Sequence, residues 1–186
     1  SWFHHLLGTN EAKYAWMDEG FTSFYDMLCE AEILGTEDPY SSFYNRYYQL
    51  VNSGVEEPLT THADRFQYNF AYGVASYSKG AVFLAQLGYI IGAENLMKTI
   101  KRYYEVFQFS HPTPNDFKRI AEKISGMQLE WYLNDWVRTT NTIDYGIQQV
   151  EEKGKKTKIT LERIGNMAMP VEVYVEAIDG SSDYYY

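Results

Sequence analysis

Hydrophobic positions recur at helical spacing through the first three quarters of the chain. Between residues 14 and 34 the apolar side chains at such spacing are those of Trp16, Phe21, Phe24, Leu28 and Ala31. Gly35 follows directly, and a glycine is typical of the position where a helix ends. The same reasoning predicts helices at about 39–52, 93–107, 114–125 and 129–138, whereas 53–69 lacks periodicity and is expected to be a long loop.

A further predicted helix, over residues 70–92, is rich in small side chains. It includes both Gly73 and Gly80, together with several alanines and serines. Glycine costs up to about 1 kcal/mol inside a helix. The two glycines therefore indicate that another backbone, or a substrate, comes close to this helix.

The period of the pattern changes from helical to alternating near Asp144. Residues 145–165 read as a hairpin with a charged tip at Glu152–Lys156, and 169–180 as a strand with three valines on one face. The sequence thus predicts a mainly α chain with a C-terminal β segment, divided into domains at 1–142 and 143–186. About three strands are expected in the second part, and so small a sheet needs partners to be stable.

Composition excludes several classes of protein. The net charge is −9 at pH 7, which argues against nucleic-acid binding, because phosphate contacts need clustered Lys and Arg. No apolar run approaches the roughly 20 residues that a transmembrane helix needs. The single cysteine, Cys29, excludes an internal disulfide and a cysteine-based metal cluster, and its helical spacing favours a small core residue.

Glu19 is a carboxylate within an otherwise apolar helical stretch. A buried Glu is rare unless it is paired or binds a metal. The alternative is an exposed side chain near the start of a helix, where the helix dipole favours negative charge. The residues alone leave both possibilities open.

The segments "SWF" and "YAWMDEGF" resemble the M1 metallopeptidases, the family of zinc aminopeptidases and leukotriene A4 hydrolase. That family's signature is HExxH, eighteen intervening residues and then a Glu. If the second His of that motif immediately preceded Ser1, residues 1–18 would be the eighteen intervening residues. Glu19 would then be the third zinc ligand. The resemblance implies the helical, C-terminal half of a thermolysin-like (gluzincin) catalytic domain, with zinc as the cofactor of the full-length protein.

A second segment, "ASYSKGA", resembles the family's YxKG motif. The resemblance assigns to Tyr77 a hydrogen bond to the oxyanion of the tetrahedral intermediate, and to Tyr72 a place in the substrate pocket. The alternative is that Tyr77 is one of 18 tyrosines packed on a helix. "ITLERIGNMAMPVEVYVEAIDG" resembles the first strands of the β-sandwich that follows the catalytic domain in this family.

The four histidines are expected to have structural or surface roles. His4 and His5 are adjacent, so on a helix they diverge by about 100° and cannot chelate one ion as an i, i+4 pair does. His62 lies in the predicted loop. The alternatives there are a solvated surface side chain and, together with Asp64, a contact with substrate. His111 precedes a proline in a connector and is assigned no role.

HExxH and the family's GxMEN segment are missing from this sequence. We therefore expect the full-length protein to be a zinc-dependent peptidase, an aminopeptidase acting on peptides, whose remaining parts pack against this chain. The 186 residues alone are expected to be inactive and to hold zinc weakly. The alternative is a non-catalytic, peptidase-like helical binding or interaction module. Export to the bacterial periplasm or envelope is expected from relatives with the same segments.

Overall fold

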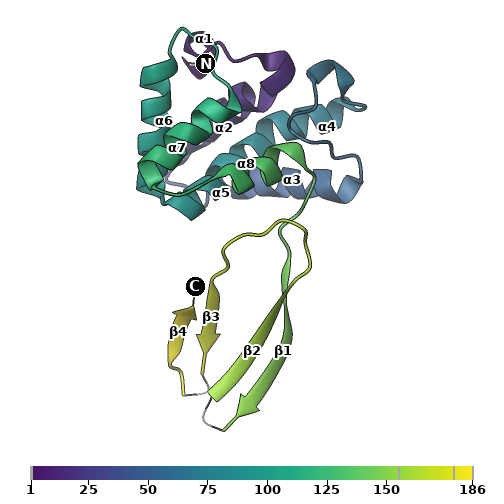
Figure 1. Cartoon of the computed structure of the whole chain (residues 1–186), viewed down its shortest axis with the longest axis vertical. Helices are drawn as coiled ribbons and strands as arrows, with labels where there is room; N and C mark the ends of the chain where they lie inside the picture. The colour runs from purple at the N-terminus through teal and green to yellow at the C-terminus, as the bar shows by residue number, and fades with distance from the viewer. Residues whose placement is uncertain (1, 155, 178, 186) are drawn as a thin grey trace. The chain divides into compact units, whose positions relative to one another are not determined.

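The computed structural model describes residues 2–154, 156–177 and 179–185, and it divides the chain into two compact units, 1–140 and 141–186 (Figure 1). The first unit is helical and the second contains the strands, so the change of period near Asp144 marks a real change of structure. The helices are α1 (Trp2–Leu6), α2 (Glu11–Leu34), α3 (Ser41–Ser53), η1 (Ala63–Arg65), α4 (Asn69–Gly73), η2 (Val74–Lys79), α5 (Gly80–Ile91), α6 (Ala93–Phe107), α7 (Pro114–Ser125) and α8 (Glu130–Arg138).

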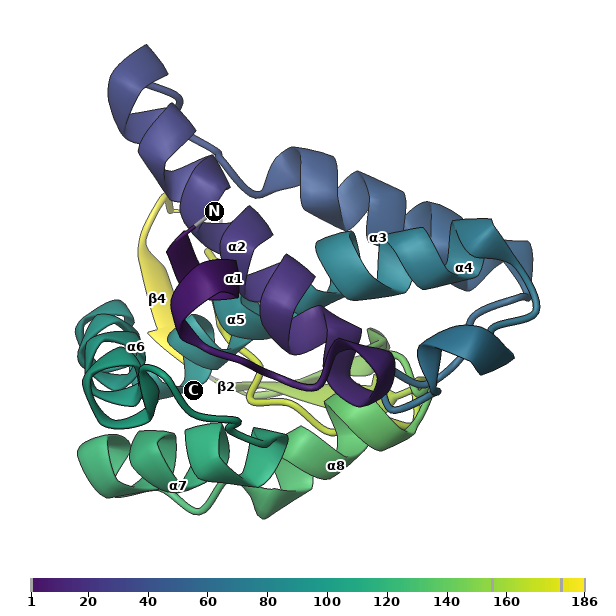
Figure 2. The ribbon, with the colours of Figure 1, turned by 90° about the horizontal axis from the view of Figure 1, so that it is seen from above.

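Aromatic side chains form the centre of the helical unit. Phe83 on α5 contacts Trp16 on α2, with ring centroids 5.0 Å apart, and Tyr132 on α8 at 5.1 Å. Phe21 packs edge-on against Phe117 of α7 at 4.9 Å. All five side chains are buried. Helices α2 and α5 supply three of these five rings, and the two helices lie against each other in the middle of the unit (Figure 2).

Several predicted helices are confirmed almost to the residue, and their ends have clear local causes. The helix at 114–125 begins at a capping box, in which the Thr113 backbone N–H donates to Asp116 Oδ2 at 2.9 Å. Gly126, with φ +73°, ends it. The helix predicted from Tyr14 begins earlier, at Glu11, where the Asn10 side chain accepts from the backbone N–H of Lys13. The backbone at Tyr14 is kinked out of helical geometry.

The predicted helix over 70–92 is confirmed as an uninterrupted helical run over 69–91, but it contains a turn that was not predicted. A π-helical turn, η2, separates α4 from α5, and the Gly80 backbone N–H donates to the Ala75 carbonyl five residues earlier. A π turn contains one more residue per turn than the α-helix on either side. The sequence predicted the helix but not this turn, because nearly all side chains of the turn are buried and no polar stripe reveals the extra residue.

Cys29 is exposed, so the prediction that it is a small core residue was wrong. The apolar spacing of α2 continues beyond the last side chain that the core covers completely, Met27. Ile33 and Leu34, at the end of the same helix, are 81% and 67% exposed. The periodicity correctly predicted an apolar face on this helix, but it did not predict where along the helix the other helices stop covering that face.

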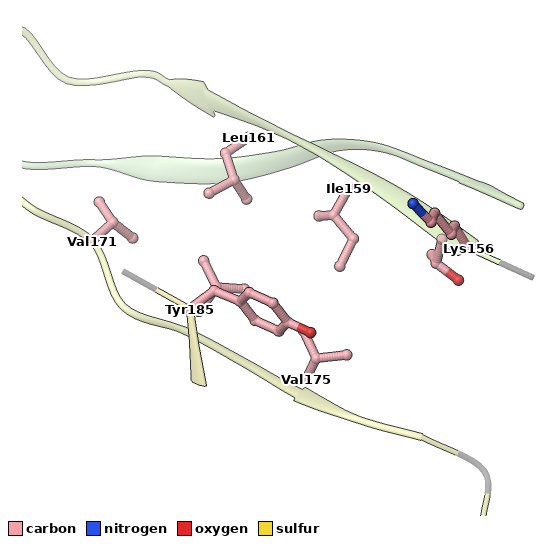
Figure 3. A pocket seen from close by; sticks show the side chains of 8 residues that line it. Lys156, Ile159, Leu161, Val171, Val175 and Tyr185 are labelled. Carbon is pink, nitrogen blue, oxygen red and sulfur yellow. The ribbon is translucent and has the colours of Figure 1, made fainter. Parts of the chain in front are cut away.

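The second unit contains two antiparallel pairs of strands. β1 (Tyr145–Lys153) pairs with β2 (Lys156–Arg163), which confirms the predicted hairpin, although Lys155 in its predicted tip lies outside the described residues. β3 (Val173–Glu176) pairs with β4 (Ser182–Tyr185), a strand that the sequence analysis did not predict. Within this unit the two pairs line a cavity of about 740 Å³, in which side chains of β2 face Val171, Val175 and Tyr185 (Figure 3).

The valine face predicted for residues 171–175 thus lines an apolar cavity (Figure 3).

Among the residues that the structure describes, no helix combines the length and apolar character that crossing a membrane requires.

Candidate functional site

Glu19 lies in the interior of α2. It follows the first residue of that helix, Glu11, by eight positions, and its side chain is half-buried among the buried residues Asp18 and Gly20. The Glu19 side chain is therefore not the fully exposed carboxylate of the alternative interpretation. Phe21 and Trp16 anchor this part of α2 in the core, which fixes the direction in which Glu19 projects.

Tyr77 lies on the π turn and is the exposed residue of that turn. Its side chain is 44% exposed, whereas Ser76 and Ser78 on either side are 2% and 3% exposed. A π turn changes the angular position of each following side chain relative to an α-helix. Here it leaves the Tyr77 ring at the surface while the remainder of the turn packs inward.

The structure brings Tyr77 and Glu19 into contact. The Tyr77 hydroxyl lies close enough to the Glu19 carboxylate to interact with it. This interaction with Glu19, followed by burial, raises the pKa of Tyr77 to about 12. The phenol resists ionisation because losing its proton would place a second negative charge beside the carboxylate. The structure thus brings together the two residues that the family resemblance singled out, and at neutral pH Tyr77 keeps its proton.

Two glycines place the helices close enough for this contact. A Cβ atom on Gly20 would lie 2.6 Å from the Gly80 Cα, and one on Gly80 would lie 2.9 Å from the Gly20 Cα. The backbones of α2 and α5 therefore touch at this crossing, one residue after Glu19 and three after Tyr77. The predicted close approach is confirmed at Gly80 but not at Gly73, where a Cβ would have nothing within 4 Å.

Tyr72, on α4, lies at the edge of the same site. Its hydroxyl interacts with the Ser76 side chain, and its ring packs edge-on against Phe66, with centroids 5.4 Å apart. Burial, and then the negative charge of Glu19, raise the pKa of Tyr72. The tyrosine is thus held in place next to the Glu19–Tyr77 pair.

The sequence analysis missed a buried ion pair beside the site. Lys79, two residues after Tyr77, is completely buried, and its Nζ lies 2.7 Å from Oε1 of Glu56, whose side chain is 7% exposed. Burial lowers the pKa of Lys79, while Glu56 opposes that shift. The available signal was a lysine in a stretch of small and apolar residues, because such a lysine requires a partner.

The histidines have the structural or surface roles expected of them where they can be described. His5 is exposed, and the side chain of His4 lies outside the described residues. His62 caps η1 by accepting from the Asp64 backbone N–H. His111, which was assigned no role, has a structural one: its Nδ1 lies 2.6 Å from the Gly8 carbonyl oxygen.

A family model, the peptidase family M1 domain, matches residues 1–136. This chain belongs to peptidase family M1. Among curated proteins, the "Probable aminopeptidase 2" of Sulfurisphaera tokodaii is 31% identical to it over 88 residues, which are 47% of this chain and 11% of that protein.

Solved structures carry the same fold. The M1 zinc metallopeptidase from Deinococcus radiodurans matches with a TM-score of 0.60 and 22% identity, over 73% of this M1 chain and 30% of its own. A mutant of that enzyme bound to a Tyr-Ser-Ala substrate matches with the same TM-score at 21% identity. The helical unit therefore has the fold of the thermolysin-like M1 domain, as predicted, and the chain spans less than a third of these relatives.

Proposed function

We propose that the whole protein containing this chain is a zinc-dependent aminopeptidase that hydrolyses peptide bonds. In this proposal Glu19 is a zinc ligand, Tyr77 stabilises the oxyanion of the reaction and Tyr72 lines the substrate pocket. The observation that supports it best is that the Tyr77 hydroxyl and the Glu19 carboxylate, far apart in sequence, lie close enough to interact. The names of the relatives, an aminopeptidase and zinc metallopeptidases with a peptide substrate, support the reaction and the metal.

The donor chemistry of Glu19 suits zinc, since carboxylate oxygens are regular zinc ligands. In the part of the chain that the structure describes, no group of three or more His, Cys, Asp or Glu side chains is arranged to hold a metal ion. We therefore propose that Glu19 supplies one ligand and that two imidazoles from outside this chain supply the others. Zinc, when bound, contributes Lewis-acid chemistry, polarising a carbonyl and acidifying water.

Tyr77 fits the role of a neutral donor to developing negative charge. A phenol ionises near pH 10, so the Tyr77 hydroxyl keeps its proton throughout the physiological range. A donor that is already in place gains strength as the carbonyl oxygen becomes an oxyanion, so it stabilises the transition state more than the substrate. The general base, a Glu of the missing HExxH segment, is proposed to come from outside this chain.

Tyr72 is proposed to form a wall of the pocket. Its contacts with Ser76 and Phe66 hold the ring rigidly, and a rigid aromatic ring is a good surface for a substrate side chain. Tyr72 is not needed as a donor in this proposal, so removing its hydroxyl is expected to affect substrate affinity more than turnover.

The test compares Glu19→Gln with Glu30→Gln in the whole protein. Glu30 is exposed on the same helix and serves as the matched control. We expect zinc content and peptide hydrolysis to be lost in Glu19→Gln and kept in Glu30→Gln. A wild-type protein that neither binds zinc nor hydrolyses aminoacyl substrates would favour the non-catalytic binding module instead.

A further inference from the structure

The most deeply buried charge of the described helical unit is the ammonium group of Lys79, and it belongs to the turn that carries Tyr77. The Lys79 side chain is 0% exposed, and its Nζ donates to Glu56 Oε1 at 2.7 Å. Glu56 comes from the long connection between α3 and η1. The pair therefore ties the π turn to a segment more than twenty residues away in sequence.

Lys79 contacts two further parts of the unit. Its Nζ lies 3.4 Å from the carbonyl oxygen of Thr139, which follows α8, and 5.6 Å from the centroid of the Tyr47 ring on α3. A lysine ammonium has three donors, and a cation over an aromatic face is attracted to it. Three separate elements thus fix the position of one side chain in η2.

Net stability is a poor explanation for such a pair. Burying two charges costs about as much as their attraction returns, so apolar residues of the same volume are often as stable. Breaking the pair from one side is costly, because it leaves a buried charge without compensation. In some proteins, buried polar or ionic groups specify one arrangement of the chain more than they add to the free energy of unfolding.

The alternative that matters here is an ordinary α-helical turn. Successive residues of a helix are separated by about 100° around its axis, so removing the extra residue of a π turn rotates one side of it relative to the other by about that angle. In an ordinary α-helical turn, this rotation would turn Tyr77 away from Glu19 if Lys79 and Gly80 kept their positions. If Tyr77 kept its position instead, the rotation would move Lys79 out of reach of Glu56.

We propose that Glu56 and Lys79 form a positioning pair, which maintains the π turn and thereby holds the Tyr77 hydroxyl against Glu19. Neither residue is proposed to touch the substrate. The catalytic consequence rests on the proposed function, whereas the effect on the position of Tyr77 does not.

The kinetic test uses the whole protein with zinc, at a temperature where every variant is folded by circular dichroism. The variants are Glu56→Gln, Lys79→Met and the double substitution, which replaces the ion pair by uncharged side chains of similar size. A displacement near 1 Å costs on the order of 100-fold in rate, so we expect kcat to fall between about 10- and 100-fold with KM nearly unchanged. The double variant is expected to regain melting temperature but not kcat.

A second readout does not depend on activity. With 3-fluorotyrosine at position 77, the fluorine NMR signal reports the surroundings of that ring, and we expect it to move in all three variants. The control is Tyr132→Phe, which removes a buried hydrogen bond to the Phe83 carbonyl oxygen on α5. It is expected to lower the melting temperature and to leave both kcat and the fluorine signal unchanged.

Variants that lose stability while keeping kcat and the fluorine signal of the wild type would overturn the positioning role. The same conclusion would follow if Tyr132→Phe moved the signal as far as Lys79→Met does. If the wild-type protein hydrolyses no peptide substrate, the proposed function fails. The fluorine signal still decides whether Glu56 and Lys79 position Tyr77.

Discussion

The Cα atom of Gly80 lies 2.6 Å from the point that a Cβ atom on Gly20 would occupy. No real side chain tolerates so short a distance to backbone, so α2 and α5 can cross here only because both residues lack a side chain. Glu19 and Tyr77 lie beside this crossing on their respective helices. The interaction between them therefore depends on the two glycines as much as on the two polar residues.

Substituting Gly20 tests this dependence. Gly20→Ala is expected to destabilise the protein by about 1–3 kcal/mol, the usual cost of overpacking a close contact. Urea denaturation measures the change in the free energy of unfolding. Gly73→Ala is the control, because Gly73 has helical backbone angles and an added Cβ would meet no atom within 4 Å. There the higher helix propensity of alanine should stabilise by up to about 1 kcal/mol, and equal losses in both variants would contradict the packing argument.

Alkaline pH provides a second test, through the buried tyrosines. Burial raises the pKa of Tyr47, Tyr103 and Tyr132 above the ordinary value. The unfolded phenols ionise near pH 10, while the folded ones keep their protons, so above pH 10 the folded state binds more protons than the unfolded state. Their contribution to stability is therefore complete below about pH 10 and is lost as the pH rises further.

We expect thermal melts to show a constant melting temperature from pH 8 to about pH 10 and a steep fall above it. Tyr103→Phe is the matched variant, since the Tyr103 hydroxyl has no hydrogen-bond partner among the described residues. It should be at least as stable as the wild type at pH 7 and lose less stability at pH 11. A fall of the same steepness in Tyr103→Phe would show that other groups cause it.

The parts of the fold that the sequence predicted well are those with local causes. The helices at 93–107 and 114–125 have strong amphipathic patterns, and the second also has its capping box at Thr113 and a terminal glycine, Gly126. The β1–β2 hairpin likewise follows from two alternating runs around a charged tip. Each of these depends on residues within a few positions of one another.

The parts that sequence did not predict depend on distant partners. The π turn has no signature in the run Val74–Lys79, since its register is linked to Glu56 and to the crossing at Gly20. Cys29 has the spacing of a core residue on a helix that continues past the core. In the site, Glu19 and Tyr77 were found through the family resemblance, whereas Lys79 and Glu56 needed the structure.

Removing the Tyr77 hydroxyl tests its proposed role in the whole protein. Tyr77→Phe is expected to lower kcat by about 100- to 1,000-fold, the usual loss for one oxyanion donor, with little change in KM. Steady-state hydrolysis of an aminoacyl anilide measures both constants. Tyr48→Phe, at an exposed tyrosine of α3, should leave them unchanged. A rise in KM alone would mean that Tyr77 only shapes the pocket.

The 186-residue chain by itself is expected to bind zinc weakly, although it contains a proposed ligand. A zinc site needs three or four protein ligands, and a single carboxylate prefers harder cations such as calcium. Calorimetric titration of the purified chain with zinc, with Glu19→Gln alongside, measures this. We expect similar weak isotherms for both proteins. A tight, stoichiometric isotherm that Glu19→Gln abolishes would contradict the view that Glu19 acts with imidazoles from outside the chain, because it would require further ligands within the 186 residues.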